Sequence, residues 1–256
     1  MRHVVLAGAL IAALPVAACS QDNSGNDAAR EASARPENTG ASPGMAVAPL
    51  DDGPRQLLTG KLEPRQAGPW APSDECGGVP GANPFRLALA HAVLALDADA
   101  IAAMALPGVR LGFGGDDGRD RFREALAAPD GKLLGELREV LSLGCAPDRS
   151  GNLVMPAYFA RDPGDIDMYS AMLVTGADVP LLAEGKAGAK MVRVMSWEVV
   201  SLDGDLQADK PYQRVKASDG AAGWVAGTAL RSLLDYRLLA TRDRGEWKIS
   251  AFLAGD

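Results

Sequence analysis

PYQRVKASDGAAGWV, at residues 211–225, is the stretch that decides the fold of the C-terminal half. Tyr212–Ala217 is expected to form one strand and Gly223–Val225 its partner. Asp219-Gly220 lies between them, and such a pair is typical of a tight hairpin turn because glycine adopts a positive φ without steric cost. The stretch therefore predicts an antiparallel β-hairpin.

Short strands continue on both sides of this hairpin. On its N-terminal side, strands are expected at 172–174, 179–182 and 190–202, and on its C-terminal side at 235–241 and 246–254. Residues 171–235 are therefore predicted to form a small all-β region, followed by a C-terminal β-hairpin at 236–256.

Helical patterns precede the β-region. Asn83 is expected to cap a helix with Pro84 at its first position, and apolar residues then recur at helical spacing. Two further helices are expected near 120–128 and 133–143, with short strands between and after the helices. Residues 71–170 thus predict an α+β domain, and the fold class of the whole chain is α+β.

Two cysteines follow Cys19, namely Cys76 and Cys145. An even number of cysteines in an exported domain indicates a disulfide, and two free thiols are the alternative.

The first residues indicate export. Arg2 and His3 are followed by an apolar run at 4–18, which is too short to span a bilayer and has the length of a signal-peptide core. The run ends in Val16-Ala17-Ala18-Cys19, which resembles the lipobox of bacterial lipoproteins. The resemblance implies cleavage after residue 18, lipidation of Cys19 and attachment to a membrane through the acyl chains. Ser20 follows the cysteine, which by resemblance implies an outer-membrane lipoprotein on the periplasmic side of the cell envelope.

Residues 19–70 are expected to be a disordered tether between the anchor and the folded part. Gln21–Gly44 has no aromatic residue and is rich in small and polar ones, so it cannot bury enough apolar surface to offset its ordering entropy. Residues 45–82 leave a second interpretation open, in which Leu57, Leu58, Leu62 and Trp70 pack on the domain as an arm.

Residues 178–231 resemble a bacterial Src-homology-3-type domain. The resemblance rests on Val179-Pro180-Leu181, on 194–200, on Pro211-Tyr212 with Val215, and on the Asp-Gly turn followed by Gly223-Trp224-Val225. Leu182 departs from the family, which usually has arginine there. The resemblance implies a small barrel that binds peptidoglycan or an envelope protein. Its candidate groove aromatics are Trp197, Tyr212 and Trp224, and the alternative is that these residues form the core, as we expect for Trp224.

Residues 83–160 also resemble the cone-shaped folds related to nuclear transport factor, and residues 247–252 resemble the closing strands of those folds. This likeness implies that the barrel is inserted into one α+β domain, which the C-terminal hairpin completes. An appended barrel is the alternative.

No catalytic, metal or cofactor motif is evident in the sequence. His91 is the only histidine after the signal, so a Cys145–His91 thiol pair or a zinc site has little support. The glycine-rich run at 112–118 lacks the Lys-Ser/Thr of a phosphate loop and reads as a turn. Removal of residues 1–18 changes the net charge from −7 to −8, which disfavours nucleic acid as a partner.

Two functions follow from these observations. The first is a non-catalytic envelope lipoprotein whose barrel binds peptidoglycan or a protein partner, with no cofactor and no metal. The second is a small-ligand carrier or envelope enzyme in the α+β region, with the barrel as a targeting module.

Overall fold

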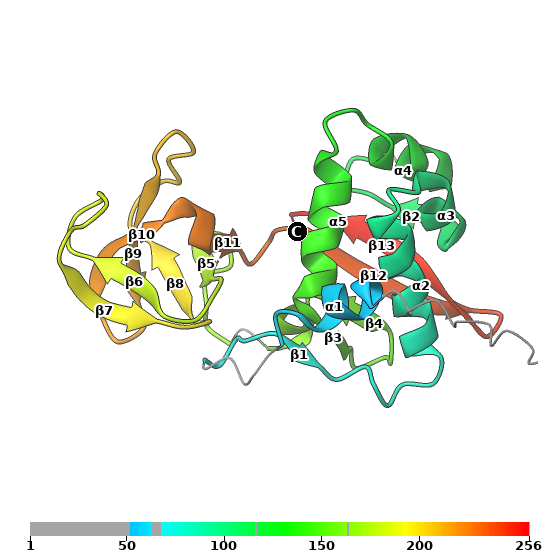
Figure 1. The fold of residues 1–256 in the computed structure, drawn as a ribbon, viewed down its shortest axis with the longest axis horizontal. Helices are drawn as coiled ribbons and strands as arrows, with labels where there is room; N and C mark the ends of the chain where they lie inside the picture. Colours follow the sequence, from blue (N-terminus) through cyan, green and yellow to red (C-terminus); the bar gives the residue numbers. More distant parts are fainter. Residues whose placement is uncertain (1–51, 63–67, 116, 163, 256) are drawn as a thin grey trace, which may run out of the picture. The chain divides into compact units, whose positions relative to one another are not determined.

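The computed structural model describes residues 52–62, 68–115, 117–162 and 164–255. The predicted signal, Cys19 and most of the predicted tether lie outside these residues. The described chain combines helices with two β-sheets (Figure 1), so the predicted α+β class is confirmed at that level. Within the described ranges, no helix is long and apolar enough to cross a membrane.

A six-stranded sheet organises the α+β part of the chain. Its strand order is β1 (Ser73–Asp74), β3 (Gly144–Pro147), β4 (Leu153–Met155), β12 (Arg237–Asp243), β13 (Glu246–Leu253) and β2 (Ala105–Arg110). The last two strands of the chain thus lie in the middle of this sheet, between β4 and β2. The chain leaves the sheet after β4, forms the all-β region and returns to complete the sheet.

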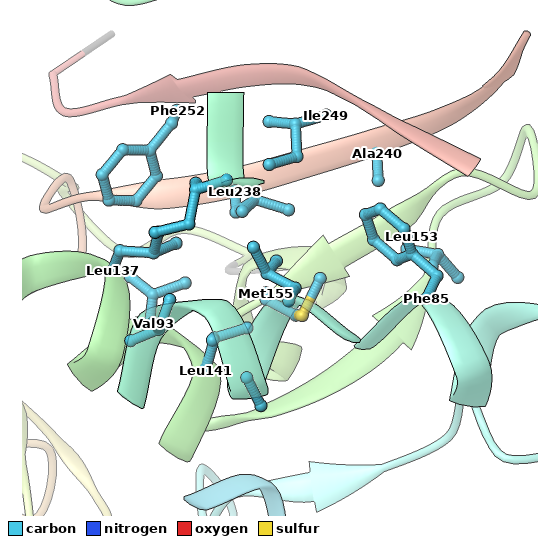
Figure 2. Close-up of a cluster of buried hydrophobic side chains, with 14 of the residues drawn as sticks. Phe85, Val93, Leu137, Leu141, Leu153, Met155, Leu238, Ala240, Ile249 and Phe252 are labelled. Carbon is cyan, nitrogen blue, oxygen red and sulfur yellow. The ribbon is translucent and has the colours of Figure 1, made fainter. Parts of the chain in front are cut away.

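Five α-helices accompany this sheet in the described ranges. They are α1 (Gly53–Thr59), α2 (Ala82–Leu94), α3 (Ala98–Ala103), α4 (Arg119–Leu126) and α5 (Lys132–Ser142), with a short 3-10 helix at Ala157–Ala160. The apolar stripes of α2 and α5 pack on the central strands, and Figure 2 shows Val93, Leu137 and Leu141 facing Met155 and Leu238. Burial of this stripe, rather than helix propensity, fixes the two helices.

Two details of the N-terminal region differ from the sequence expectations. The expected tether reaches residue 70, whereas Gly53–Thr59 is helical, because Leu58 is buried in the main core and Leu57 packs against it. Helix α2 begins at Ala82 after Gly81, and the Asn83 side chain donates to the Gly77 carbonyl instead of capping the helix.

The predicted disulfide is confirmed. Cys76 and Cys145 are bonded, with 5.6 Å between their Cα atoms, and both are fully buried. Beside them, Nη1 of the buried Arg86 donates to both carboxylate oxygens of Asp74 at 2.8 and 3.0 Å. The disulfide and this ion pair fasten residues 73–76 to β3 and α2.

The all-β region is a seven-stranded sheet. Its order is β11 (Leu230–Ser232), β5 (Ala171–Val174), β8 (Val199–Leu202), β9 (Tyr212–Ala217), β10 (Ala222–Ala226), β6 (Val179–Leu182) and β7 (Met191–Met195), with a 3-10 turn at Gly227–Ala229. Among the described residues the sheet is open, with β11 and β7 at its edges, so the closed barrel expected from the sequence is not present. The β9–β10 hairpin forms as predicted, with Val215 opposite Gly223.

Candidate functional site

A groove of about 850 Å³ lies over β8 and β9 and is the candidate functional site. We call it the β8–β9 groove. Its walls come from the segment at 68–70, the loop at 165–167, the residues around the end of β7, and the strands β8 and β9 with Ser218. Ser201 and Lys216 are paired across the two strands and therefore project to the same side of the sheet.

The segment at 68–70 lines the groove because its backbone is bonded to the β-region. The N–H of Trp70 donates to the carbonyl of Trp197 at 3.0 Å. Gly68 has a φ of +123°, and a Cβ atom there would lie 1.9 Å from the carbonyl oxygen of Ser196. Only glycine allows this approach. The guanidinium of Arg161 also donates to the Pro69 carbonyl, which holds the segment from its other side.

The charged groups of the groove differ in how they are held. Arg193 donates two hydrogen bonds to the two carboxylate oxygens of Glu198, at 2.9 and 2.7 Å. Asp167 accepts from the Ser170 hydroxyl at 2.8 Å and from the Tyr169 N–H at 3.2 Å, and these bonds lower the pKa of Asp167. Lys216 is exposed on β9. The groove is thus lined by the exposed amine of Lys216 and by carboxylates, of which Asp167 has a lowered pKa.

Trp197 is not a groove residue. Its side chain is 2% exposed and packs in a cluster with Leu143, Tyr158, Leu173 and Leu233. The backbone of Trp197 has a positive φ of +44°. The tryptophan that lines the groove is Trp70, half-buried and directly bonded to Trp197 through the backbone. From the sequence, Trp70 was expected only to pack on the domain as part of an extended arm, and not to line a groove.

Trp224 and Tyr212 lie outside the β8–β9 groove, although strand alternation places them on the same side of β9 and β10 as Lys216. In β9 and β10 the buried residues are Gln213, Val215, Ala217, Gly223 and Val225, so Trp224 and Tyr212 point away from the core side and are half-buried. Trp224 pairs with Arg214 and covers Gly185, where a Cβ atom would lie 2.8 Å from its ring. The expectation that Trp224 is a core residue is wrong, because strand alternation gives the core position to Val225. Neither aromatic lines the β8–β9 groove.

No family model, no curated protein and no solved structure matches this chain. The interpretation of the groove therefore rests on its own geometry.

The α+β region has a separate hollow of about 480 Å³. Tyr236 and Phe252 stack there with ring centroids 5.1 Å apart, and Leu111 and Leu133 are further apolar walls. Arg121 and Glu124 also line it and are joined by an ion pair of 3.0 Å.

The other residues weighed for chemistry have structural positions. His91 is exposed on α2, and Cys145 is held in the disulfide. Asp117, in the glycine-rich run, accepts a hydrogen bond from the N–H of Leu111 at 2.8 Å and so closes a turn. In the part of the chain that the structure describes, no three His, Cys, Asp or Glu side chains gather as a metal site would require.

Proposed function

We propose that this chain is an exported lipoprotein, anchored to the outer membrane through Cys19, whose Src-homology-3-like β-region binds peptidoglycan or an envelope protein without catalysis. The observation that carries the proposal is the β8–β9 groove, whose walls carry Trp70, Lys216 and the carboxylates of Asp167 and Glu198. Aromatic faces together with a few fixed polar groups are what polar polymers require for recognition.

The bonding of the groove carboxylates favours binding over acid–base chemistry. A general acid needs a pKa near the working pH, whereas the hydrogen bonds from Ser170 and Tyr169 lower the pKa of Asp167. Glu198 is fixed by two bonds to Arg193. Both carboxylates are suited to holding a cationic or hydroxyl group of a ligand in place.

Co-sedimentation of the mature chain with purified sacculi, and its pull-down from envelope extract, test this proposal. The tested protein carries Cys19→Ser, which keeps the chain in solution. Lys216→Glu should reduce the retained fraction by about tenfold, since it replaces an attractive charge by a repulsive one. Lys132→Glu, at an exposed position of α5, makes the same change of charge away from the groove and should bind as the parent does. Equal retention of both variants would contradict the assignment of the groove.

A second candidate function rests on the hollow beside Tyr236 and Phe252. Its stacked aromatic wall suits a small flat ligand, as a carrier in the α+β region would bind. A rise of the thermal midpoint with a member of a small-molecule library, lost in Ala125→Trp, would favour this function. Binding to sacculi or to an envelope protein that depends on Lys216 would favour the non-catalytic binding function instead.

A further inference from the structure

A small apolar hollow adjoins the β8–β9 groove. Its volume is about 170 Å³, and its lining residues are Trp70, Tyr158, Phe159, Arg161, Met168 and Leu233. Trp70 lines the hollow and the groove alike. Only the Trp70 side chain is common to the two linings, so a ligand that lies along the groove can extend past Trp70 into the hollow.

The size of the hollow fits one large apolar side chain. A cavity of about 150 Å³ is known to hold a benzene-sized group. The walls are fixed, since Tyr158 is 4% exposed and Leu233 is 1% exposed. A side chain of leucine, methionine or phenylalanine size would fill the hollow, whereas a methyl group would leave most of it empty.

The charge at the hollow is positive. Arg161 lines it directly, and the guanidinium of Arg237 lies 4.4 Å from the centroid of the Phe159 ring. The Pro69 carbonyl and, at 3.5 Å, the Ser73 hydroxyl fix the direction of Arg161. None of the six described residues that line the hollow carries a carboxylate. An apolar interior beside a fixed guanidinium is complementary to an apolar group that carries a negative charge.

We propose that this hollow is the specificity subsite of the groove and takes a leucine-, methionine- or phenylalanine-sized side chain next to a carboxylate, as the C-terminal residue of an extended polypeptide presents them. The inference rests on the proposed function and narrows its partner to a protein segment. Peptide stems of peptidoglycan end in alanine, whose methyl group does not fill the hollow.

Three acetylated pentapeptides test the subsite by isothermal titration on the mature Cys19→Ser chain. They are Ser-Ala-Ser-Ala-Phe with a free carboxylate, the same peptide ending in alanine, and the phenylalanine peptide as its amide. The phenylalanine acid should bind at least about tenfold more tightly than either of the others, because each lacks one of the two recognised groups.

Two variants assign the two parts of this preference. Met168→Trp fills the hollow and should remove the preference for phenylalanine over alanine. Arg161→Gln should remove the preference for acid over amide and keep the preference for phenylalanine. Arg149→Gln, on the exposed turn after β3, is the charge-matched control and should leave all three affinities unchanged. Thermal midpoints of the variants show that each is folded.

Three outcomes would overturn the subsite: equal affinity for the three peptides, no binding at millimolar concentration, or a phenylalanine preference that persists in Met168→Trp. If the subsite fails while Lys216→Glu still reduces retention on sacculi or extract, the groove stands without it. If Lys216→Glu changes nothing in either assay, the proposed function fails as well.

Discussion

The backbone N–H of Trp70 lies 3.0 Å from the carbonyl oxygen of Trp197 and donates a hydrogen bond to it. From this shared bond the two side chains diverge, since Trp197 is buried in a core cluster and Trp70 lines the β8–β9 groove. A few residues further along the chain, Cys76 is joined to β3 by the disulfide. The segment at 68–76 is thus attached both to the all-β region and to the six-stranded sheet.

Gly68→Ala should weaken this attachment. The new Cβ atom would lie 1.9 Å from the Ser196 carbonyl oxygen, and the φ of +123° is already unfavourable for alanine. We expect the free energy of unfolding to fall by about 2–4 kcal/mol, measured by urea denaturation. Gly151→Ala separates the two causes, because Gly151 also has a positive φ of 80° but no atom within 4 Å of the new methyl group. That control should lose only about 1–2 kcal/mol. Equal losses in the two variants would show that the contact with Ser196 is unimportant.

The sequence predicts the elements of this chain better than it predicts their assembly. The hairpin at 212–226 is encoded locally by Asp219-Gly220 and was found as expected. The return of β12 and β13 to the centre of the six-stranded sheet depends on contacts of Leu238 with residues far away in the chain, such as Met155. A local sequence pattern does not show which distant strands pair. The only sequence feature that indicated the return of the C-terminal hairpin to the α+β sheet was the likeness of residues 247–252 to the closing strands of another fold.

Removal of the disulfide should be costly for stability. The double variant Cys76→Ser/Cys145→Ser loses a cross-link with a sequence separation of 69 residues. The chain-entropy model assigns about 4 kcal/mol to a loop of this size. Denaturation of the variant, compared with the parent in the oxidised form, measures this loss. Intact mass of the parent should show two hydrogens fewer than the reduced chain, and two readily alkylated thiols without reductant would contradict the bond.

Cys19→Ser should leave unlipidated precursor. Cys19 lies outside the described residues, and the prediction rests on Val16-Ala17-Ala18-Cys19 in the sequence. Detergent-phase partitioning of the parent and the variant measures the loss of the anchor. Val16→Asp, which changes the apolar position of the motif, should behave like Cys19→Ser. A variant at Cys19 that still enters the detergent phase would exclude lipidation at this residue.

Asp148 should give the turn after β3 a dependence on pH. Burial raises the pKa of Asp148, but hydrogen bonds from the Asn152 side chain and from the backbone of residues 150–152 together lower it below its ordinary value. A carboxylate with a lowered pKa stabilises the fold at neutral pH, and this contribution is lost as the pH falls through the folded-state pKa. The protection factors of the Ser150 and Asn152 amides, which compare their exchange rates with the intrinsic rate at each pH, should therefore fall on acidification in the parent. Asp148→Asn should show no such acid-dependent change, and an identical pH dependence in both would contradict the role of Asp148.

The candidate site was harder to anticipate than the fold because it depends on which way individual aromatic side chains point. Trp197, Tyr212 and Trp224 were chosen as groove aromatics because of their positions in the family-like motif, yet none of them lines the β8–β9 groove. Trp197 lies between β7 and β8, outside both strands, with a φ of +44°, so strand alternation does not fix the direction of its side chain. Trp70 comes from a region whose composition predicts a tether. Its position depends on the missing side chain of Gly68, which only the folded contact reveals.

Alanine substitutions at Trp197 and Trp224 should distinguish the core tryptophan from the surface one. Trp197 is 2% exposed among Leu143, Tyr158 and Leu173, so Trp197→Ala leaves a large cavity and should cost about 3–5 kcal/mol. Trp224 is half-buried on the outer side of β10, where Val225 takes the core position, so Trp224→Ala should cost clearly less. Thermal melts of the two variants and the parent measure this order.

Trp197→Phe is the matched control, because it keeps an apolar ring in the cluster and should recover much of the loss. The reverse order, with Trp224→Ala the more damaging, would place the core of the β-region on the other face of β9 and β10. Trp197→Ala keeps the backbone carbonyl that accepts the hydrogen bond from Trp70, but Trp70 also packs against the cluster that holds the Trp197 ring, so loss of the ring should lower binding in the groove by displacing Trp70. Trp224→Ala should leave that binding unchanged.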